Sequence, residues 1–226
     1  MELVKCVNLN KSYGDKQVLK NVNLTIPKGK IIGLLGKNGT GKSTLIKLMN
    51  DLLIPTSGEI LVNNEKIGVN SKKVISYLPE RTYLDKSMTV NQVIDYFEDF
   101  YDNFDSKKAR KLLKDLDLDV TQKLSKMSKG MQEKVQLVLV MSRKADLYIL
   151  DEPTTGLHFE DVRVLMGVLR RLVDKGNTVI IIEHNPDVIR SCDYIVDMGP
   201  DGGRDGGTIV ATGTVEEIRE NKNSIT

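Results

Sequence analysis

The chain has few of the residues that characterise disulfide-rich, zinc-binding or membrane-spanning proteins. Its 226 residues include only two cysteines, Cys6 and Cys192, whose separation fits neither a metal-ligand motif nor a disulfide framework. No apolar run approaches the roughly 20 residues that are needed to span a bilayer. No signal peptide precedes the first predicted strand. We therefore expect a soluble, cytoplasmic chain with no membrane span of its own.

Charge of one sign is not in excess either. Lys and Arg number 33 against 31 Asp and Glu, so the total gives no sign of a basic surface for DNA or RNA, and we expect no direct contact with nucleic acid. Histidine is scarce, with His158 and His184 as the only two. A chain of 226 residues can bury a sizeable core, as one large domain or as two small ones.

What the chain does contain is a complete phosphate-binding loop. Residues 36–44 match G-x-x-x-x-G-K-[ST] at every fixed position, between an apolar run at 31–35 and an amphipathic run at 45–49. Glycines let successive backbone N–H groups face phosphate oxygens, and the following helix adds the positive end of its dipole. Lys42 would contact the β- and γ-phosphates, and the Ser43 hydroxyl would hold Mg²⁺. We predict an ATP site that includes Gly36, Asn38, Gly39, Gly41, Lys42, Ser43 and Thr44.

The hydrophobic pattern predicts an α/β fold with a mixed β core and flanking helices. Residues 3–9 and 18–26 are typical of strands and, with 31–35, predict an antiparallel β flank beside a parallel αβ core. No alternation of period two occurs between residues 87 and 143, so this stretch is predicted to be a mainly helical insert. A capping box at 89–92 opens its first helix, with Val93, Ile94, Phe97 and Phe100 on one face.

Acidic residues end the apolar strand predicted over residues 146–152. Burial explains the apolar side chains of this strand, but it does not explain why Asp151 and Glu152 stand at its end. In a P-loop protein, an acid in this place holds Mg²⁺ and a second acid can orient water. A further strand, 178–182, ends next to His184, from which the imidazole could reach the phosphates. Tyr13 is either a base-stacking aromatic or an ordinary turn residue.

The order of these motifs resembles the nucleotide-binding subunit of an ABC transporter over essentially the whole chain. The resemblance implies that Tyr13 stacks on the base, that Asp151 binds Mg²⁺ and that Glu152 is the catalytic carboxylate. It implies further that His184 contacts the γ-phosphate. Residues 127–132, Met-Ser-Lys-Gly-Met-Gln, resemble the family's signature sequence. By resemblance, Ser128 and Gly130 would bind the γ-phosphate held by the other subunit, so that two chains arranged head to tail would enclose two ATP molecules.

Three positions depart from the transporter pattern. Glu80 stands where the family usually has Gln before the helical insert, and it remains a candidate Mg²⁺ ligand. The signature reads Ser-Lys-Gly in place of Ser-Gly-Gly, and His158 replaces a usual Asp.

The last third of the chain resembles a second family. Residues 156–161, 176–189, 197–207 and the tail 213–226 look like the UvrA-type ATPase of excision repair. We therefore predict a single ABC nucleotide-binding domain over 1–226, with a helical subdomain at about 87–143 and a possible junction of two families near 151–156. The two families share Asp-Glu-Pro-Thr there, so that a chimera, natural or engineered, would preserve the strand and its acids.

The leading functional prediction is a Mg²⁺-dependent ATPase subunit of an ABC transporter. It would lie at the inner face of the membrane and energise a separate permease, whose coupling helix would dock on residues 87–143. One alternative is a mosaic that folds and binds ATP without coupling to transport or without turnover. Another is a soluble repair-type ATPase, although the cysteine pairs for zinc modules and a second ATPase half are absent from the sequence.

Overall fold

The computed structural model describes residues 2–203, 206–222 and 224, and the statements below concern these residues. Of the segments that resemble the UvrA-type ATPase, residues 197–207 and the tail 213–226 therefore fall partly outside the description. The strands are β1 (Glu2–Tyr13), β2 (Lys16–Pro27), β3 (Ile31–Leu35), β4 (Ser57–Val62), β5 (Glu65–Lys66), β6 (Ile75–Leu78), β7 (Leu147–Asp151), β8 (Thr178–Ile182), β9 (Tyr194–Gly199) and β10 (Thr208–Gly213). The helices are α1 (Lys42–Met49), α2 (Val69–Val74), α3 (Val90–Phe100), α4 (Ser106–Asp115), the 3₁₀ helix η1 (Leu124–Lys126), α5 (Lys129–Met141), α6 (Phe159–Asp174), α7 (Pro186–Arg190) and α8 (Val215–Glu220).

Among the described residues the strands form two sheets. The larger one has six strands in the order β10-β9-β3-β8-β7-β6, parallel except for β10, which pairs antiparallel with β9. The smaller one has the order β2-β1-β4-β5 and is antiparallel. This arrangement confirms the predicted α/β class, with a mixed core sheet and an antiparallel flank.

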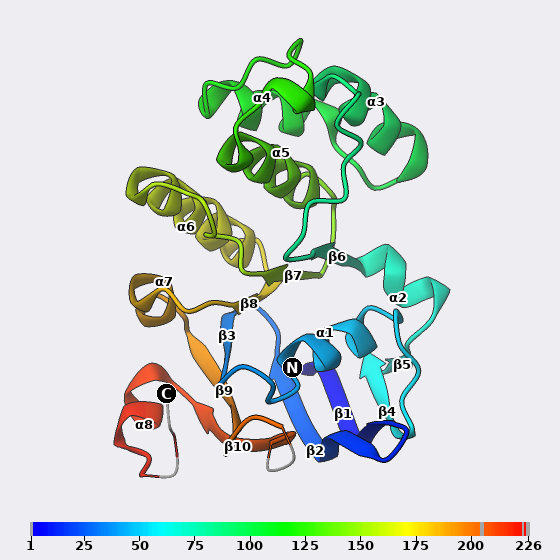
Figure 1. The fold of residues 1–226 in the computed structure, drawn as a ribbon, viewed down its shortest axis with the longest axis vertical. Helices are drawn as coiled ribbons and strands as arrows, with labels where there is room; N and C mark the ends of the chain where they lie inside the picture. Colours follow the sequence, from blue (N-terminus) through cyan, green and yellow to red (C-terminus); the bar gives the residue numbers. More distant parts are fainter. Residues whose placement is uncertain (1, 204–205, 223, 225–226) are drawn as a thin grey trace.

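The central strands are buried on both faces, as expected for parallel strands covered by helices. In β3, Ile32 and Leu34 pack in one core, while Ile31 and Leu35 pack in the other. The first core also contains the buried side chains of α1 and of the antiparallel sheet, so α1 lies between the two sheets (Figure 1). The second core joins the sheet to α5 and α6. The helix that begins at the phosphate-binding loop is thus held on both sides.

Helices α3, α4 and α5 lie together at one end of the molecule, above the end of the large sheet (Figure 1). They share a separate hydrophobic cluster that includes Val93, Ile94 and Phe97. Thr89 caps α3, since its hydroxyl accepts a hydrogen bond from the Gln92 amide at 3.3 Å. Phe100 was predicted on the same buried face, but it is 65% exposed and stacks on Tyr96. No helix in the described part of the chain has the length and apolar character to cross a membrane.

Candidate nucleotide-binding site

The predicted site residues gather at the carboxyl ends of three neighbouring parallel strands. The P-loop follows β3, Asp151 ends β7 with Glu152 directly after it, and His184 follows β8. Strand β8 lies between β3 and β7, and Asp151 pairs with Ile182 across the ladder. Ligands of open α/β sheets bind at this edge, so the topology brings together side chains that are far apart in the sequence.

Glycine is required at the turns of the P-loop by its backbone geometry. Gly36, Gly39 and Gly41 have φ angles of 135°, 85° and 98°, in the region that L side chains rarely adopt. A Cβ on Gly36 would collide with the carbonyl oxygen of Met198, and one on Gly41 would lie 2.7 Å from Leu19 Cδ2. The loop is therefore packed against β9 and β2 in a shape that only glycines permit.

The Lys42 side chain is bound by backbone carbonyl groups of the P-loop itself. Its Nζ donates hydrogen bonds to the carbonyl oxygens of Gly36 at 2.5 Å and Lys37 at 3.0 Å. Burial lowers the pKa of the Lys42 ammonium, and the negative charges of Glu152, Asp151 and Asp197 oppose this shift. A buried cation facing carboxylates is suited to receive a polyphosphate, which would bring it further negative charge.

Most of the predicted site residues line one cavity of about 670 Å³. Its lining includes ten of them: Tyr13, Asn38, Gly39, Gly41, Lys42, Ser43, Thr44, Glu80, Asp151 and Glu152. Lys16, Val18, Ile182 and Gly203 also line it, and the sequence analysis did not single these out. The first residues of α1 border the cavity, so the positive end of that helix dipole points toward any phosphate bound there.

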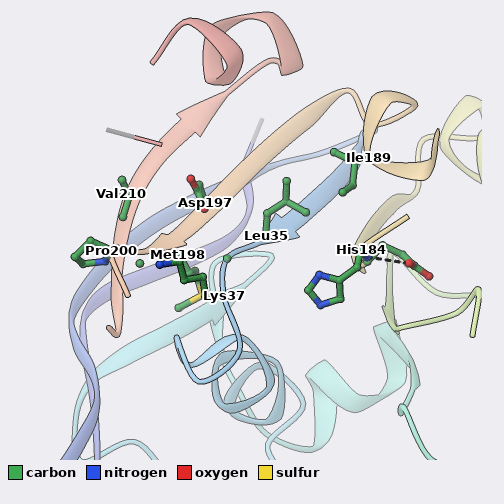
Figure 2. A pocket seen from close by; sticks show the side chains of 11 residues that line it. Leu35, Lys37, His184, Ile189, Asp197, Met198, Pro200 and Val210 are labelled. Carbon is green, nitrogen blue, oxygen red and sulfur yellow. Dashed lines mark hydrogen bonds between the residues drawn. The ribbon is translucent and has the colours of Figure 1, made fainter. Parts of the chain in front are cut away.

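Two further predicted residues, Gly36 and His184, line an adjoining cavity of about 270 Å³ (Figure 2). The imidazole of His184 projects into this space (Figure 2). Its Nε2 atom also lies 4.0 Å from Oε1 of Glu152, which lines the larger cavity. Glu152 and His184 therefore face each other across the boundary between the two spaces.

The environment of Asp151 favours its protonated form. Burial, and then the negative charges of Glu80 and Glu152, raise the pKa of the Asp151 carboxyl from 3.8 to about 6, while Lys47 and Lys42 lower it. Only 7% of the residue is exposed. A bound cation would relieve this cost, because it would compensate the buried negative charge.

The donor atoms present fit Mg²⁺ bound together with phosphates. Ser43, Asp151 and Glu80 line one cavity and offer a hydroxyl and two carboxylates. Within the described residues, no group of three or more His, Cys, Asp or Glu side chains could hold a metal by itself. Mg²⁺ commonly takes one or two protein carboxylates and completes its octahedron with water and substrate phosphates. Such an ion would neutralise phosphate charge and fix the γ-phosphate for attack.

Tyr13 and Glu80 reach the cavity from its rim. Tyr13 ends β1 and is 48% exposed, with the Lys11 ammonium 5.0 Å from its ring centroid. Glu80 follows β6 in a loop that α5 holds, because Gln136 accepts from the Tyr83 amide at 3.3 Å and donates to Pro79 at 3.4 Å. The ring of Tyr13 is thus half exposed at the cavity, and hydrogen bonds of Gln136 link the Glu80 loop to α5.

The structure does not bring Ser128 and Gly130 to either cavity. Ser128 is exposed and caps α5, its hydroxyl accepting from the Met131 amide at 3.3 Å. A Cβ on Gly130 would lie 2.7 Å from the carbonyl oxygen of Gly156, so the start of α5 packs closely on the loop that follows β7. The action of both residues on a nucleotide held by another chain stays a prediction.

Glu183, which is only 6% exposed, was not predicted from the sequence as a site residue. Its carboxylate accepts hydrogen bonds from Thr154, His184 and Asn185, and it thereby joins the segments that follow β7 and β8. Glu183 stands next to His184 in the sequence, but only the fold shows which atoms it binds.

Solved structures of ATP-binding cassettes share this fold. One ATP-binding subunit of an ABC transporter is 26% identical, with a TM-score of 0.85 over 96% of this chain and 92% of that one. CbiO1 of Clostridium perfringens, part of the ABC transporter complex cbiONQ, is 27% identical with a TM-score of 0.78 over 98% and 92%. The cassette MJ0796, in a dimeric post-hydrolysis state bound to ADP and Pi, is 25% identical with a TM-score of 0.81 over 94% and 99%.

Curated relatives include UvrABC system protein A from several bacteria. The protein of Aquifex aeolicus is 44% identical over 156 residues, which cover 65% of this chain and 17% of the relative. That of Deinococcus radiodurans is 45% identical over 149 residues, covering 61% and 15%. The chain thus spans about a sixth of the length of these relatives. A match over 65% of the chain is longer than residues 154–226, so the likeness to UvrA extends beyond the last third. The junction near 151–156 stays a prediction.

The sequence model of the family described as ABC transporter matches residues 19–155, which is more than half of the chain. The match includes the P-loop, the segment that resembles the signature and the two acids that end β7. The chain belongs to the ABC transporter family and carries its ATP-binding cassette.

Proposed function

We propose that the chain is a Mg²⁺-dependent ATPase that works as a head-to-tail dimer and energises a separate membrane permease. The observation that carries the ATPase proposal is the shared cavity, in which Lys42, Asp151 and Glu152 meet at the ends of β3 and β7. A phosphate-binding loop alone would support binding. Two carboxylates beside it supply a place for the metal and a group to orient water.

The proposed chemistry is in-line attack of water on the γ-phosphate. Glu152 would orient that water, and Lys42 and His184 would stabilise the negative charge that spreads over the phosphate oxygens. Ser43 and Asp151, with Glu80 as a further candidate, would hold Mg²⁺, which when bound would supply positive charge that offsets the charge of the phosphates. The Tyr13 ring, which is half exposed at the rim, would stack on the base.

Dimerisation would complete the site. Ser128 and Gly130 lie outside both cavities of their own chain, at the beginning of α5, where the positive end of the helix dipole favours an anion. In a head-to-tail pair each chain would present this helix end to the ATP held by the P-loop of the other chain. Dimeric structures such as that of MJ0796 support this proposal.

A groove of about 520 Å³ beside α3 is the surface we propose for the permease. Its lining is aromatic and partly exposed: Tyr83, Leu84, Asp85, Met88, Val93, Tyr96, Phe97, Phe100 and Tyr101. Phe100 and Tyr96 are 65% and 55% exposed, and exposed aromatic clusters of this kind are typical of protein interfaces. The groove lies on α3 and the loop before it, and α3 shares a hydrophobic cluster with α5. A bound permease helix could therefore act on α5, which Ser128 caps.

DNA repair is the second candidate, since the identity to UvrABC system protein A, 44%, exceeds that to the transporter subunits, 26% and 27%. A mosaic that retains ATP binding without coupling to a permease would also account for these two likenesses. A repair role requires DNA binding that weakens as salt concentration rises. Binding of duplex DNA by the purified chain, measured at two salt concentrations with and without ATP, separates this candidate from the first.

The direct experiment is phosphate release from ATP by the purified chain, with Mg²⁺ or with EDTA. Lys42→Ala is expected to abolish ATP affinity and turnover, because it removes the cation of the P-loop. Lys111→Ala is the matched control, since Lys111 is exposed on α4 and lines neither cavity. ATP binding that survives Lys42→Ala would contradict the assignment of the site. Mg²⁺-dependent release lost only in Lys42→Ala would support it.

A further inference from the structure

Glu183 is a buried carboxylate that receives hydrogen bonds at both of its oxygens. Oε1 accepts from the Thr154 amide at 2.8 Å and from the Thr154 hydroxyl at 2.5 Å. Oε2 accepts from the amides of His184 at 3.0 Å and Asn185 at 3.3 Å. Within the described part of the chain, no lysine or arginine forms a salt bridge with it. The cost of burying this carboxylate is therefore offset by the four N–H and O–H donors.

The donors come from two different parts of the chain. Thr154 belongs to the segment that leaves β7 directly after the acids, whereas His184 and Asn185 leave β8. Each carboxylate oxygen of Glu183 accepts hydrogen bonds from one of these segments, so the carboxylate bridges the two. Glu152 and His184, which lie 4.0 Å apart, are each within two residues of an atom that the bridge holds.

We infer that Glu183 is a positioning residue for ATP hydrolysis: its carboxylate fixes the placement of His184 relative to Glu152. This inference depends on the proposed function, because those two side chains are the ones assigned there to the γ-phosphate and to the attacking water. The side chains of Glu152 and His184 are too far apart for a direct hydrogen bond. Their relative placement therefore depends on the backbone around them. The Glu152 amide donates to the Ile182 carbonyl at 3.0 Å, and beyond that point the bridge joins the two backbones through Thr154 and His184.

If the inference is correct, position 183 requires a carboxylate, and a neutral polar side chain is not sufficient. A glutamine has one acceptor oxygen and one NH₂ group, which would face the amides of His184 and Asn185 in one orientation and the amide and hydroxyl of Thr154 in the other. Glu183→Gln would therefore keep the bonds to one segment and lose those to the other. Thr154→Val removes only the hydroxyl donor and keeps the amide, while Thr154→Ser keeps both donors.

The test compares Thr154→Val, Thr154→Ser and Glu183→Gln by two readouts. The first is the split of kcat and KM for ATP hydrolysis. We expect kcat to fall about 10- to 100-fold in Thr154→Val and Glu183→Gln, as small misplacements of reacting groups do. KM should stay near the wild-type value, because the P-loop is untouched, and Thr154→Ser should stay near wild type in both parameters.

The second readout is the NMR signal of the His184 imidazole, which does not require turnover. His158→Ala leaves His184 as the only histidine, so its resonance is assigned directly. We expect this resonance to shift in Thr154→Val and Glu183→Gln but not in Thr154→Ser. If Glu183→Gln does not fold, the two Thr154 variants decide the question by themselves.

The outcomes separate this inference from the proposed function. A wild-type chain without ATPase activity would remove the proposed function, and the imidazole resonance would still test the bridge. An active wild type whose Thr154→Val and folded Glu183→Gln variants keep their kcat, or keep the His184 resonance unshifted, would overturn the inference.

Discussion

The Nε2 atom of His184 lies 4.0 Å from Oε1 of Glu152, although the two residues follow different strands. Glu152 reaches this position with a φ angle of 53°, which is uncommon for a residue other than glycine. Its amide is nevertheless anchored, because it donates to the Ile182 carbonyl at 3.0 Å. Strained backbone that the surrounding structure fixes in this way is characteristic of functional sites.

His184→Ala is expected to lower kcat for ATP hydrolysis by about 10²-fold, the usual effect of removing one group that stabilises transition-state charge. KM should change little, because the contacts of Lys42 are intact. Steady-state phosphate release measures both. His158→Ala is the matched control: that histidine caps α6, is exposed and lines neither cavity. Equal kcat in the two variants would remove His184 from the mechanism.

Asp151→Asn should stabilise the chain at pH 8 when Mg²⁺ and nucleotide are absent. The folded protein raises the pKa of Asp151 from 3.8 to about 6, so it binds the proton more tightly than the unfolded chain does. Its stability therefore falls as pH rises from about 4 to about 6, and remains lower above. Removing the charge should raise the free energy of unfolding by on the order of 2–3 kcal/mol at pH 8 and by little at pH 4. Urea unfolding at both pH values measures this; an equal gain at both would contradict the burial argument.

Mixing two inactive variants should restore activity if the dimer is head to tail. Ser128→Arg would damage the start of α5 that a chain presents to its partner's nucleotide. Lys42→Ala would damage the P-loop of the chain that carries it. A mixed dimer contains one site with both parts intact, so an equal mixture should recover about a quarter of wild-type phosphate release.

The control for this experiment mixes Lys42→Ala with Glu152→Gln. Both changes lie in the same cavity, so every site of a mixed dimer stays damaged and no recovery is expected. Recovery in the control, or none in the test mixture, would rule out the head-to-tail arrangement.

The sequence predicted the parts of the molecule whose geometry is local. The P-loop glycines and the capping box at Thr89 determine the conformation of neighbouring residues, and the structure has both where they were expected. The double burial of β7 follows from its unbroken apolar run, and Asp151 at its end then lies at the edge of the sheet.

Features that depend on distant partners were not predictable in this way. Strand β9 was missed, because Asp197 interrupts its apolar run and its parallel pairing with β3 decides its conformation. Phe100 has the helical spacing of a core residue, but the last turn of α3 extends past the cluster that buries Phe97. The partners of Glu183 depend on Thr154, which only the fold places beside it.

ATP turnover by Glu152→Gln, measured beside the wild type and with sizing of both proteins in ATP, tests the central claim most directly. Loss of the carboxylate should keep ATP affinity, slow phosphate release by about 10²-fold or more, and accumulate an ATP-bound dimer, because hydrolysis no longer separates the chains. Normal turnover in Glu152→Gln, or loss of turnover with both proteins remaining monomeric in ATP, would contradict a hydrolytic site completed between two copies.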